Sequence, residues 1–529
     1  MLDKLSIFMH LVNNPATKKT LQSFACYCNS CKKNRLEVAL ELIVGERDDA
    51  CWKCKFAAKT LEPILKRGGE AFNVSVDELK EKFTDAYWRK GLASVIKGLA
   101  YFGVRKPFVP GAPFQVVWDI TYACNLRCKH CYATAGKPLE DELTTEEALE
   151  TIDKFDKLGV TIISFSGGEP LVRKDILELA SYAAEKGIYI ALATNGTLIT
   201  EERAKQLKEN GVSYLQISLD GTQATHDSFR GIKGCWAKTI EGIKNAVRQG
   251  FFVNVSMTVT KLNLHEVPQV IELCRRLGVD WFMHYNFVPT GRGKDIASLD
   301  LSPQEREVLL RMLYYENMSS RENKADLVTE SESSNSGPIS NSKTLSLLST
   351  APQFARVALQ CNAEFIPTHF YNVNAGERLR QLAEFIGGCG AGRFYMSMRA
   401  NGDIQPCVFF PLKIANIRDL SYRDLEDLWL HNPVFEELRN KDLIEGCNQC
   451  SYRYYCGGCR ARAYNYYGDY LKPDPGCINN QKEWEELLSK IEAGKATKLA
   501  AAYLNERLKT VSYTHLRAHE TSLHLVCRL

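Results

Sequence analysis

A regular alternation of short apolar runs and amphipathic segments extends from about residue 114 to residue 290. The apolar runs have the length and composition of strands: Gln115–Thr121, Thr161–Phe165, Tyr189–Thr194, Tyr214–Leu219, Phe252–Thr260 and Trp281–Val288. Between them, hydrophobic residues recur with the period of a helix in Thr145–Leu158, Asp175–Lys186, Thr200–Asn210, Cys235–Gln249 and Leu264–Leu277. Because strands that alternate with helices form parallel sheets, the sequence predicts an α/β fold. We expect a partial (β/α)6 barrel of the TIM type, with its site in the loops that follow the strands.

The length of 529 residues is too great for one hydrophobic core, and we expect about two to four domains. We predict a small Cys-rich N-terminal region (1–110), the barrel (111–300), a linker (301–386), a Cys-rich domain (387–485) and a C-terminal helix (486–510). Residues 318–350 are rich in Ser, Glu and Asn, which predicts a disordered insertion in the linker. Residues 511–529 resemble translated sequencing-adapter read-through, so we interpret this tail as an artefact. The alternatives are a natural helical tail or a metal site at His515, His519 and His524.

Composition excludes several classes of protein. A net charge of +4 is small for this length and gives no reason to expect a nucleic-acid partner. No apolar run approaches the roughly 18 residues of a membrane span, and the N-terminus does not resemble a signal peptide. The 19 cysteines include several C-x2-C pairs, which indicate metal or cluster ligands that must stay reduced. We therefore expect a cytoplasmic protein from an anaerobic host.

Three cysteines, Cys124, Cys128 and Cys131, lie close together directly after the first predicted strand, and Tyr132 follows them. Three thiolates on one loop can each hold one iron of a cubane cluster, which leaves the fourth iron without a protein ligand. Structural zinc sites use four ligands, so three cysteines alone are an unusual zinc site. The alternative is a chance group of buried thiols.

A second motif, Gly167-Gly168-Glu169-Pro170, directly follows the second predicted strand. A turn of this composition is weak evidence by itself, because Gly and Pro occur in turns everywhere. Together with C-x3-C-x2-C and the following aromatic residue, it resembles the radical S-adenosylmethionine (radical SAM) enzymes. The resemblance implies a [4Fe–4S] cluster on the three cysteines, whose open iron binds SAM and cleaves it reductively to a 5′-deoxyadenosyl radical. It also implies that Gly167, Gly168, Glu169 and Pro170 orient the ammonium group of SAM.

Further contacts follow from the same resemblance. Thr194 and Asn195 end the third predicted strand, while Ser218 and Asp220 end the fourth, where the family binds the SAM carboxylate and ribose. Each of these residues also has an ordinary interpretation as part of a turn. Tyr132 is expected to pack beside the adenine, with simple core packing as the alternative.

Seven cysteines lie close together in the sequence near the C-terminal end: Cys389, Cys407, Cys447, Cys450, Cys456, Cys459 and Cys477. Their order resembles the SPASM extension, which carries auxiliary [4Fe–4S] clusters, although two residues rather than the usual three separate Cys456 from Cys459. By resemblance, Cys447, Cys450, Cys456 and Cys477 hold one cluster, and Cys389, Cys407 and Cys459 hold another. The fourth ligand of the second cluster is absent, exogenous or Cys361, and zinc is the alternative for the set of four cysteines. Residues 456–477 look like the branch that includes heme and heme d1 biosynthesis enzymes and also peptide- and cofactor-maturation enzymes.

The N-terminal region contains another pair of C-x2-C motifs. Nineteen residues separate Cys28 and Cys31 from Cys51 and Cys54, a spacing typical of zinc sites. An additional iron–sulfur cluster or unliganded thiols are the alternatives. We recognise no family resemblance in this region.

The sequence thus predicts a radical SAM enzyme that modifies a peptide, protein or cofactor precursor. A tetrapyrrole of the heme pathway is an alternative substrate. A non-enzymatic iron–sulfur carrier or scaffold is an alternative of another class, although a carrier has no need of the Gly167–Pro170 turn. A reduced ferredoxin or flavodoxin is the expected electron donor.

Overall fold

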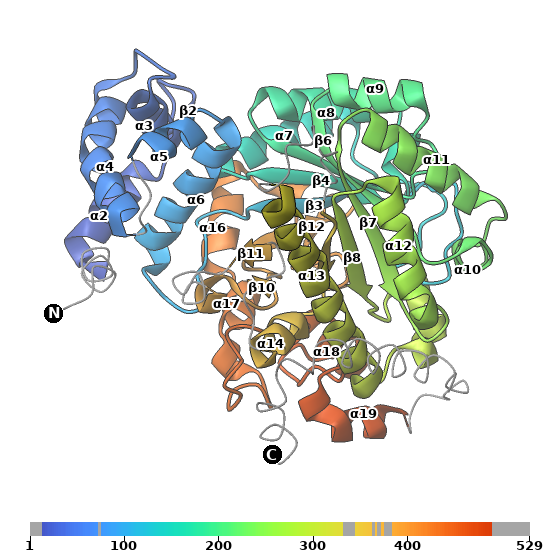
Figure 1. Cartoon of the computed structure of the whole chain (residues 1–529). Coiled ribbons are helices and arrows are strands. Elements are labelled where there is room, and N and C mark those ends of the chain that lie inside the picture. Colours follow the sequence, from blue (N-terminus) through green and yellow to red (C-terminus); the bar gives the residue numbers. More distant parts are fainter. Residues whose placement is uncertain are drawn as a thin grey trace.

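The computed structural model describes residues 13–71, 76–331, 344–361, 365–367, 372–374 and 383–488. A helical N-terminal unit lies beside a large curved sheet, and C-terminal segments cover the side of the sheet that its own helices leave free (Figure 1). The predicted tail at 511–529, and the predicted C-terminal helix beyond residue 488, lie outside the described residues. None of the described helices combines the length and apolar composition that a membrane span requires.

Ten strands form the main sheet, in the order β14-β13-β12-β3-β4-β5-β6-β7-β8-β9. The central strands are β3 (Gln115–Thr121), β4 (Ile162–Gly167), β5 (Tyr189–Thr194), β6 (Val212–Ser218), β7 (Phe252–Val259) and β8 (Trp281–Asn286). They are the six predicted strands, and they pair in parallel with one another. The other four strands are β9 (Ser346–Ser349), β12 (Tyr395–Met398), β13 (Asp403–Gln405) and β14 (Ala415–Asn416). Of these, β9 and β12 extend the parallel part at its two ends, so the barrel has eight parallel strands rather than six.

Helices between the strands cover one face of the sheet (Figure 1). They are α7 (Thr145–Leu158), α8 (Ile176–Glu185), α9 (Glu201–Glu209), α11 (Cys235–Arg248) and α12 (Val267–Leu277), all within three residues of their predicted bounds. An extra helix, α10 (Gln223–Arg230), follows β6. The start of α7 is fixed by a capping box in which Thr144 and Glu147 bond to each other's backbone N–H groups.

Residues alternate in character along the central strands. Those that face the helices are apolar and buried, as in Val116, Trp118, Ile163, Phe165 and Val255. Their neighbours, on the opposite face, include Asp119, Ser164, Ser166, Gln216, Asn254 and Tyr285. Successive strand residues point to opposite faces, so the helix-free face of the sheet is polar. This face and the loops at its carboxyl edge are therefore the place for a polar site.

The prediction of a linker over 301–386 with a disordered insertion at 318–350 is wrong for the described part of that segment. Helix α13 (Pro303–Ser331) runs into the predicted insertion, and β9 ends it by pairing with β8. The Asn317 side chain exchanges two 3.3 Å hydrogen bonds with the backbone of Leu347. Polar composition before residue 344 concealed these elements, because a four-residue strand next to a long polar stretch gives almost no periodic signal. Residues 332–343 lie outside the described residues.

The N-terminal unit consists mainly of helices: α2 (Pro15–Phe24), α3 (Arg35–Val44), α4 (Trp52–Ala71), α5 (Val76–Phe83) and α6 (Ala86–Phe102). A two-stranded sheet, β1 (Tyr27–Cys28) with β2 (Lys33–Asn34), precedes α3. The unit has its own hydrophobic core, built around Leu21, Leu36 and Leu61. The proline-rich segment that leads from α6 into β3 is largely buried and serves as part of the interface, since Trp429 donates a hydrogen bond to Pro110 O (3.0 Å).

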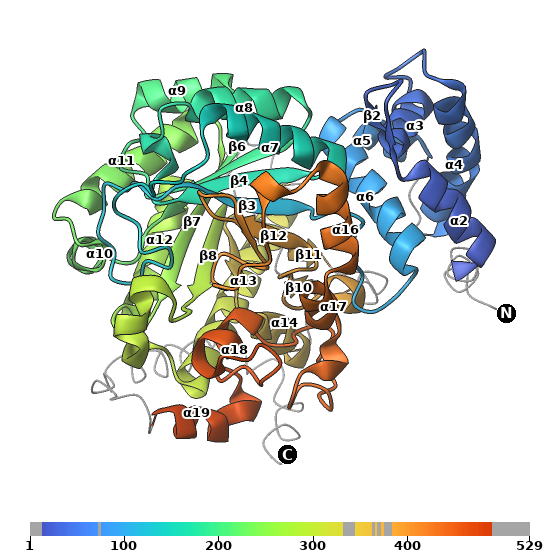
Figure 2. The same ribbon diagram turned by 180° about the vertical axis from the view of Figure 1, so that it is seen from behind.

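Buried charges join the N-terminal unit to the barrel. Lys90 on α6 is 1% exposed and lies 3.3 Å from Glu37 on α3 and 2.5 Å from Asp156 on α7. Burial alone would lower the pKa of Lys90, yet the two carboxylates raise it above its usual value. A second lysine on α6, Lys97, pairs with Glu426 on α16 (Tyr422–His431), which Figure 2 shows between α6 and the barrel.

The remaining C-terminal elements pack around the helix-free face of the sheet. They are α14 (Gln353–Gln360), β10 (Phe365–Pro367), β11 (Asn372–Asn374), α17 (Pro433–Arg439), α18 (Arg460–Tyr467) and α19 (Gln481–Leu488). The predicted domain 387–485 is thus continuous with the main sheet, because β12, β13 and β14 extend the edge next to β3.

Replacement of Lys90 by Met should destabilise the protein by about 3 to 5 kcal/mol, because the nearly fully buried Glu37 would lose its cationic partner. An anaerobic urea titration followed by circular dichroism measures this free energy. Lys205→Met is the matched control, since Lys205 forms an exposed pair with Glu209 (3.9 Å) and should change stability little. Equal effects of the two substitutions would contradict a stabilising role for the buried contact.

Candidate functional site

The cysteine loop begins directly beyond the carboxyl end of β3. Cys128 is buried, Cys124 and Cys131 are half-buried, and all three are free thiols in one apolar cluster with Leu126 and Cys235. Burial raises the pKa of Cys124 to about 11, and nearness to Glu169, Cys128 and Cys131 contributes. Three unpaired thiols on one loop fit a [4Fe–4S] cluster with one iron left open.

Arg292 binds backbone carbonyl groups of the cysteine loop. Its guanidinium donates to Cys128 O (2.9 Å) and Ala135 O (2.7 Å), and its backbone N–H donates to Cys131 O (2.9 Å). The preceding Gly291 approaches so closely that a Cβ atom there would lie 2.3 Å from Tyr132 O. Sequence patterns do not indicate Arg292, because it lies far along the chain from the cysteines, after β8.

The Gly167-Gly168-Glu169 turn packs directly against the start of the cysteine loop. Gly168 N donates to Thr121 O (2.7 Å), and Glu169 N donates to Ala123 O (2.8 Å). A Cβ atom on Gly168 would lie 2.1 Å from Ala123 O, and Gly167 has a φ of 124°. Side chains at these two positions would therefore force the turn away from the loop.

Glu169 gathers the ends of β4 and β5. Its carboxylate is fully buried and accepts hydrogen bonds from Thr194 Oγ1 (2.7 Å), Leu171 N (3.1 Å) and Asn195 N (2.9 Å). The Asn195 side chain in turn donates to Asn125 Oδ1 (2.8 Å), inside the cysteine loop. Because each carboxylate oxygen can accept two hydrogen bonds, Glu169 Oε2 can accept one more besides the bond from Asn195 N. The structure thus brings the predicted residues Glu169, Thr194 and Asn195 together.

Asp220 and Ser218, at the end of β6, have different surroundings. Ser218 is half-buried, whereas Asp220 is fully buried with its Oδ2 2.6 Å from Arg230 Nη2 and 3.4 Å from His130 Nε2. Burial alone would raise the pKa of Asp220, but the Arg230 guanidinium, followed by His130 and His226, holds it below its usual value. Asp220 Oδ2 therefore lies against Arg230 and the cysteine loop, whereas its Oδ1 accepts from Thr258 N on β7 (2.9 Å). The ribose contact of Asp220 stays a prediction.

Arg230, at the end of α10, is a site residue that the sequence did not reveal. Its Nη1 lies 3.6 Å from Cys128 Sγ, while its Nη2 pairs with Asp220. His130 stacks on the neighbouring Phe229 with the ring centres 4.1 Å apart. Only the three-dimensional fold brings α10 to the cysteine loop, and Arg230 belongs to no recognisable motif.

Tyr132 directs its hydroxyl group onto the polar face of the sheet. It donates to Asp119 Oδ1 (2.8 Å) and lies 3.0 Å from Ser166 Oγ. Burial raises the pKa of Asp119 to about 7, against the lowering effects of Tyr132 and Arg399. The ring of Tyr132 meets Phe409 with the centres 5.1 Å apart, and Phe409 follows Cys407 by two residues. The polar face of the sheet therefore borders both the first cysteine loop and the C-terminal cysteines.

The seven C-terminal cysteines separate into two groups. Burial raises the pKa of Cys456, and the nearness of Cys477 and Cys447 raises it further. Burial also raises the pKa of Cys447, with a contribution from Cys450. In the other group, burial raises the pKa of Cys407 to about 12, with a contribution from Cys389. Burial also raises the pKa of Cys459, and both Cys389 and Cys407 contribute. These groups agree with the two predicted ligand sets. Cys361 lies instead beside Arg311, 3.6 Å from its Nη1, so its recorded contacts give no support to a ligand role.

A buried charge network fixes both C-terminal ligand loops. Asp474 accepts hydrogen bonds from Cys459 N (2.7 Å), Gly476 N (2.8 Å) and Arg462 Nε (3.1 Å). Arg462 also pairs with Asp300 (2.6 Å), which in turn pairs with Arg306 on α13 (2.7 Å). All four charged side chains are at most 1% exposed.

The four N-terminal cysteines form the tightest group of potential ligands among the described residues. The Sγ atoms of Cys28, Cys31, Cys51 and Cys54 all lie within 4.8 Å of one another. The structure thus brings together the four thiols whose spacing predicted a metal site.

Solved structures share this fold. SuiB from Streptococcus suis superposes with a TM-score of 0.53 and 17% identity, over 83% of this chain and 92% of SuiB. The same protein bound to S-adenosylmethionine gives a TM-score of 0.52 at 18% identity, over 80% of this chain and 90% of that chain. At such identities the likeness shows the fold alone.

Relatives of known activity are closer in sequence. An AdoMet-dependent heme synthase from Methanosarcina barkeri is 34% identical over 375 residues, which are 69% of this chain and 97% of that protein. A heme synthase from Nitratidesulfovibrio vulgaris is 33% identical over 68% of this chain and 91% of its own length. A mycofactocin maturase from Mycolicibacterium smegmatis is 30% identical over 69% of this chain and 83% of its own length.

Two family models match this chain, one over the cysteine loop of Cys124, Cys128 and Cys131 and the other from Cys389 to just beyond Cys450. The radical SAM superfamily matches residues 118–274, and the SPASM iron–sulfur cluster-binding domain matches residues 389–451. The first range contains the cysteine loop and the Gly167–Glu169 turn, and neither range reaches the N-terminal unit. The chain therefore belongs to the radical SAM superfamily and is an enzyme of that superfamily with a SPASM iron–sulfur domain.

Proposed function

We propose that this enzyme binds a [4Fe–4S] cluster through Cys124, Cys128 and Cys131 and uses SAM to modify a tetrapyrrole precursor. The observation that carries the activity is the contact between the three-thiol loop and the Gly167–Gly168–Glu169 turn. This contact brings the cluster ligands next to a carboxylate that can accept from the amino group of SAM. Thr194, Asn195 and Ser218 complete the proposed SAM site.

When bound, the cluster and SAM supply the electron and the 5′-deoxyadenosyl radical that removes a hydrogen atom from the substrate. The protein supplies orientation, a dry environment and charge. Burial of Cys128 and Glu169 excludes water from the base of the site. Arg230 places a positive charge beside Cys128, and Asp220 acts through Arg230 by holding its guanidinium in place.

The substrate would lie on the polar face of the sheet, between the cysteine loop and the loop of Cys407. Asp119 reaches both sides of this space, since it accepts from Tyr132 and its charge also raises the pKa of Cys407. Tyr285 and Gln216, joined by a 2.8 Å hydrogen bond, line the same face. Auxiliary clusters on the SPASM cysteines would pass electrons or bind the substrate.

A tetrapyrrole substrate is supported by the sequence relatives. Heme, iron coproporphyrin III and pre-heme d1 are the tetrapyrroles in the names of relatives that are 29% to 34% identical to this chain. A peptide precursor is the second candidate. It is supported by SuiB, which has been crystallised with its precursor peptide SuiA and shares the fold. A reduced ferredoxin or flavodoxin in the cytoplasm is the proposed electron donor.

The anaerobically reconstituted enzyme should release 5′-deoxyadenosine from SAM in the presence of dithionite. Iron coproporphyrin III should accelerate this release and should itself change in mass, as measured by liquid chromatography and mass spectrometry. Cys128→Ala should abolish the release, whereas Cys26→Ala, at an exposed cysteine far from the site in sequence, should retain it. Acceleration by a precursor peptide but not by the porphyrin would contradict the proposed substrate.

Arg230→Gln should make the reduction potential of the SAM-binding cluster more negative, because a cation beside Cys128 stabilises the added electron. Arg230→Lys keeps the charge and should restore most of the difference. A redox titration followed by electron paramagnetic resonance measures both variants. Equal potentials in the wild type and the Gln variant would contradict this role for Arg230.

Asp119 should make substrate binding depend on pH near 7. The pKa of its carboxyl is raised to about 7, so the group is largely neutral below that pH and charged above it. If the substrate carries carboxylates, its KM should rise as the pH increases from 6 to 8, because ionised Asp119 repels it. In Asp119→Asn the KM should stay nearly constant over this range. A pH dependence that is the same in both proteins would exclude Asp119 as its origin.

A further inference from the structure

We propose that Cys28, Cys31, Cys51 and Cys54 bind one Zn²⁺ ion as a closed tetrathiolate site. The Sγ atoms of Cys28 and Cys51 are 3.6 Å apart, and those of Cys51 and Cys54 are 3.5 Å apart. Four sulfurs at a Zn–S distance of about 2.3 Å stand roughly 3.8 Å apart at the corners of a tetrahedron. The separations are far longer than a disulfide bond of about 2.05 Å. The four thiols therefore surround a space for a single ion.

The same spacing argues against a cubane cluster at this site. In a [4Fe–4S] cluster each thiolate binds a different iron, so the sulfurs stand further apart than sulfurs that share one ion. Elsewhere in the described chain, neither the loop of Cys124 nor the SPASM cysteines form such a tight group. The protein thus contains two kinds of cysteine sites, and the N-terminal site is of the mononuclear kind.

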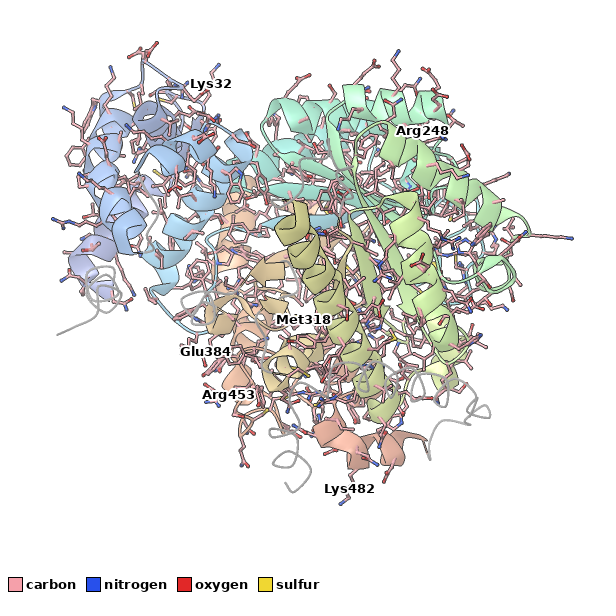
Figure 3. All side chains as sticks on the ribbon, viewed as in Figure 1. Lys32, Arg248, Met318, Glu384, Arg453 and Lys482 are labelled. Atoms are coloured by element: carbon pink, nitrogen blue, oxygen red, sulfur yellow. The ribbon has the colours of Figure 1, made fainter. Side chains whose placement is uncertain are left out.

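The surrounding backbone is built for metal ligation. Cys28 ends β1, and Cys31 lies in the turn before β2, next to the exposed Lys32 (labelled in Figure 3), which has a φ of 52°. Cys51 and Cys54 lie at the start of α4, and Cys51 N donates to Cys31 Sγ (3.4 Å). Each strand of this hairpin has only two residues, which is too short to be stable without further support. A shared ion would supply that support by joining the hairpin to α4.

The position of the site assigns it a structural role and favours zinc over a single iron ion. Cys28 and Cys54 are buried, and four thiolates leave no open coordination position for a substrate. Asn34, the last residue of β2, caps α3 by accepting from Leu36 N (2.9 Å). Helix α3 carries Glu37 to Lys90, which also pairs with Asp156 of the barrel. A redox-inert ion suits this position, since it fixes the hairpin without changing charge during turnover.

The test measures metal in the whole enzyme after anaerobic purification with its iron–sulfur clusters. Plasma mass spectrometry should find about one zinc per chain, and zinc X-ray absorption should find about four sulfurs at roughly 2.3 Å. Cys54→Ser should lower the zinc content at least tenfold, while Cys26→Ser should retain it. Cys26 is a matched control because it lies two residues before Cys28 and is exposed. Its thiol makes a weak hydrogen bond to Ser23 O (3.4 Å).

Other outcomes would overturn the assignment. Zinc that remains in Cys54→Ser would be bound elsewhere, and a wild-type protein without zinc would exclude the site. A single iron ion bound by four thiolates would give a high-spin ferric signal in electron paramagnetic resonance after mild oxidation. Loss of that signal in Cys54→Ser would assign iron rather than zinc to the site. If Cys54→Ser does not fold, the zinc X-ray absorption spectrum of the wild type shows whether four sulfurs bind the ion. Because metal content is read separately from 5′-deoxyadenosine formation, failure here would leave the proposed activity untouched.

Discussion

The approach of one turn to one loop determines the geometry of the site. Gly168 brings its backbone so close to Ala123 that no side chain fits between them, and two backbone hydrogen bonds close the contact. Glu169 then collects the ends of two strands and, through Asn195, the interior of the cysteine loop. Glu169, Thr194 and Asn195 are buried, so water does not compete for the hydrogen bonds that this carboxylate accepts from the other two residues. The positions of the three thiols therefore follow from the parallel pairing of β3 with β4.

The two faces of the sheet have separate tasks. Apolar residues such as Trp118 and Phe165 pack against the helices and supply the stability of the barrel. Their neighbours Asp119 and Ser166 carry polar groups to the other face, where the C-terminal segments meet it. Because residues alternate along each strand, the residues that stabilise the fold differ from those that line the site. Residues on the polar face can therefore change without loss of the hydrophobic core.

The local patterns were sufficient to predict the central strands, the cysteine loop and the Gly167–Glu169 turn, because each is encoded within a few adjacent residues. Strand β9 escaped prediction because four residues are too few to show a period. Arg230 and Arg292 escaped for another reason: the thiol and the carbonyl groups that they contact in the cysteine loop are more than 100 residues away in sequence. The N-terminal thiols were foreseeable from two C-x2-C pairs, but only coordinates distinguish a site for one ion from a cluster site.

The network of Arg462, Asp474, Asp300 and Arg306 bears on where substrate and product can enter and leave the enzyme. It joins the cysteine-bearing C-terminal loops to the segment after β8, and none of its members has access to water. Hinging the SPASM domain away from this side would strand unpaired charges, at a cost of several kcal/mol for each broken contact. We therefore expect this seam to stay closed, with reactants entering along another part of the rim.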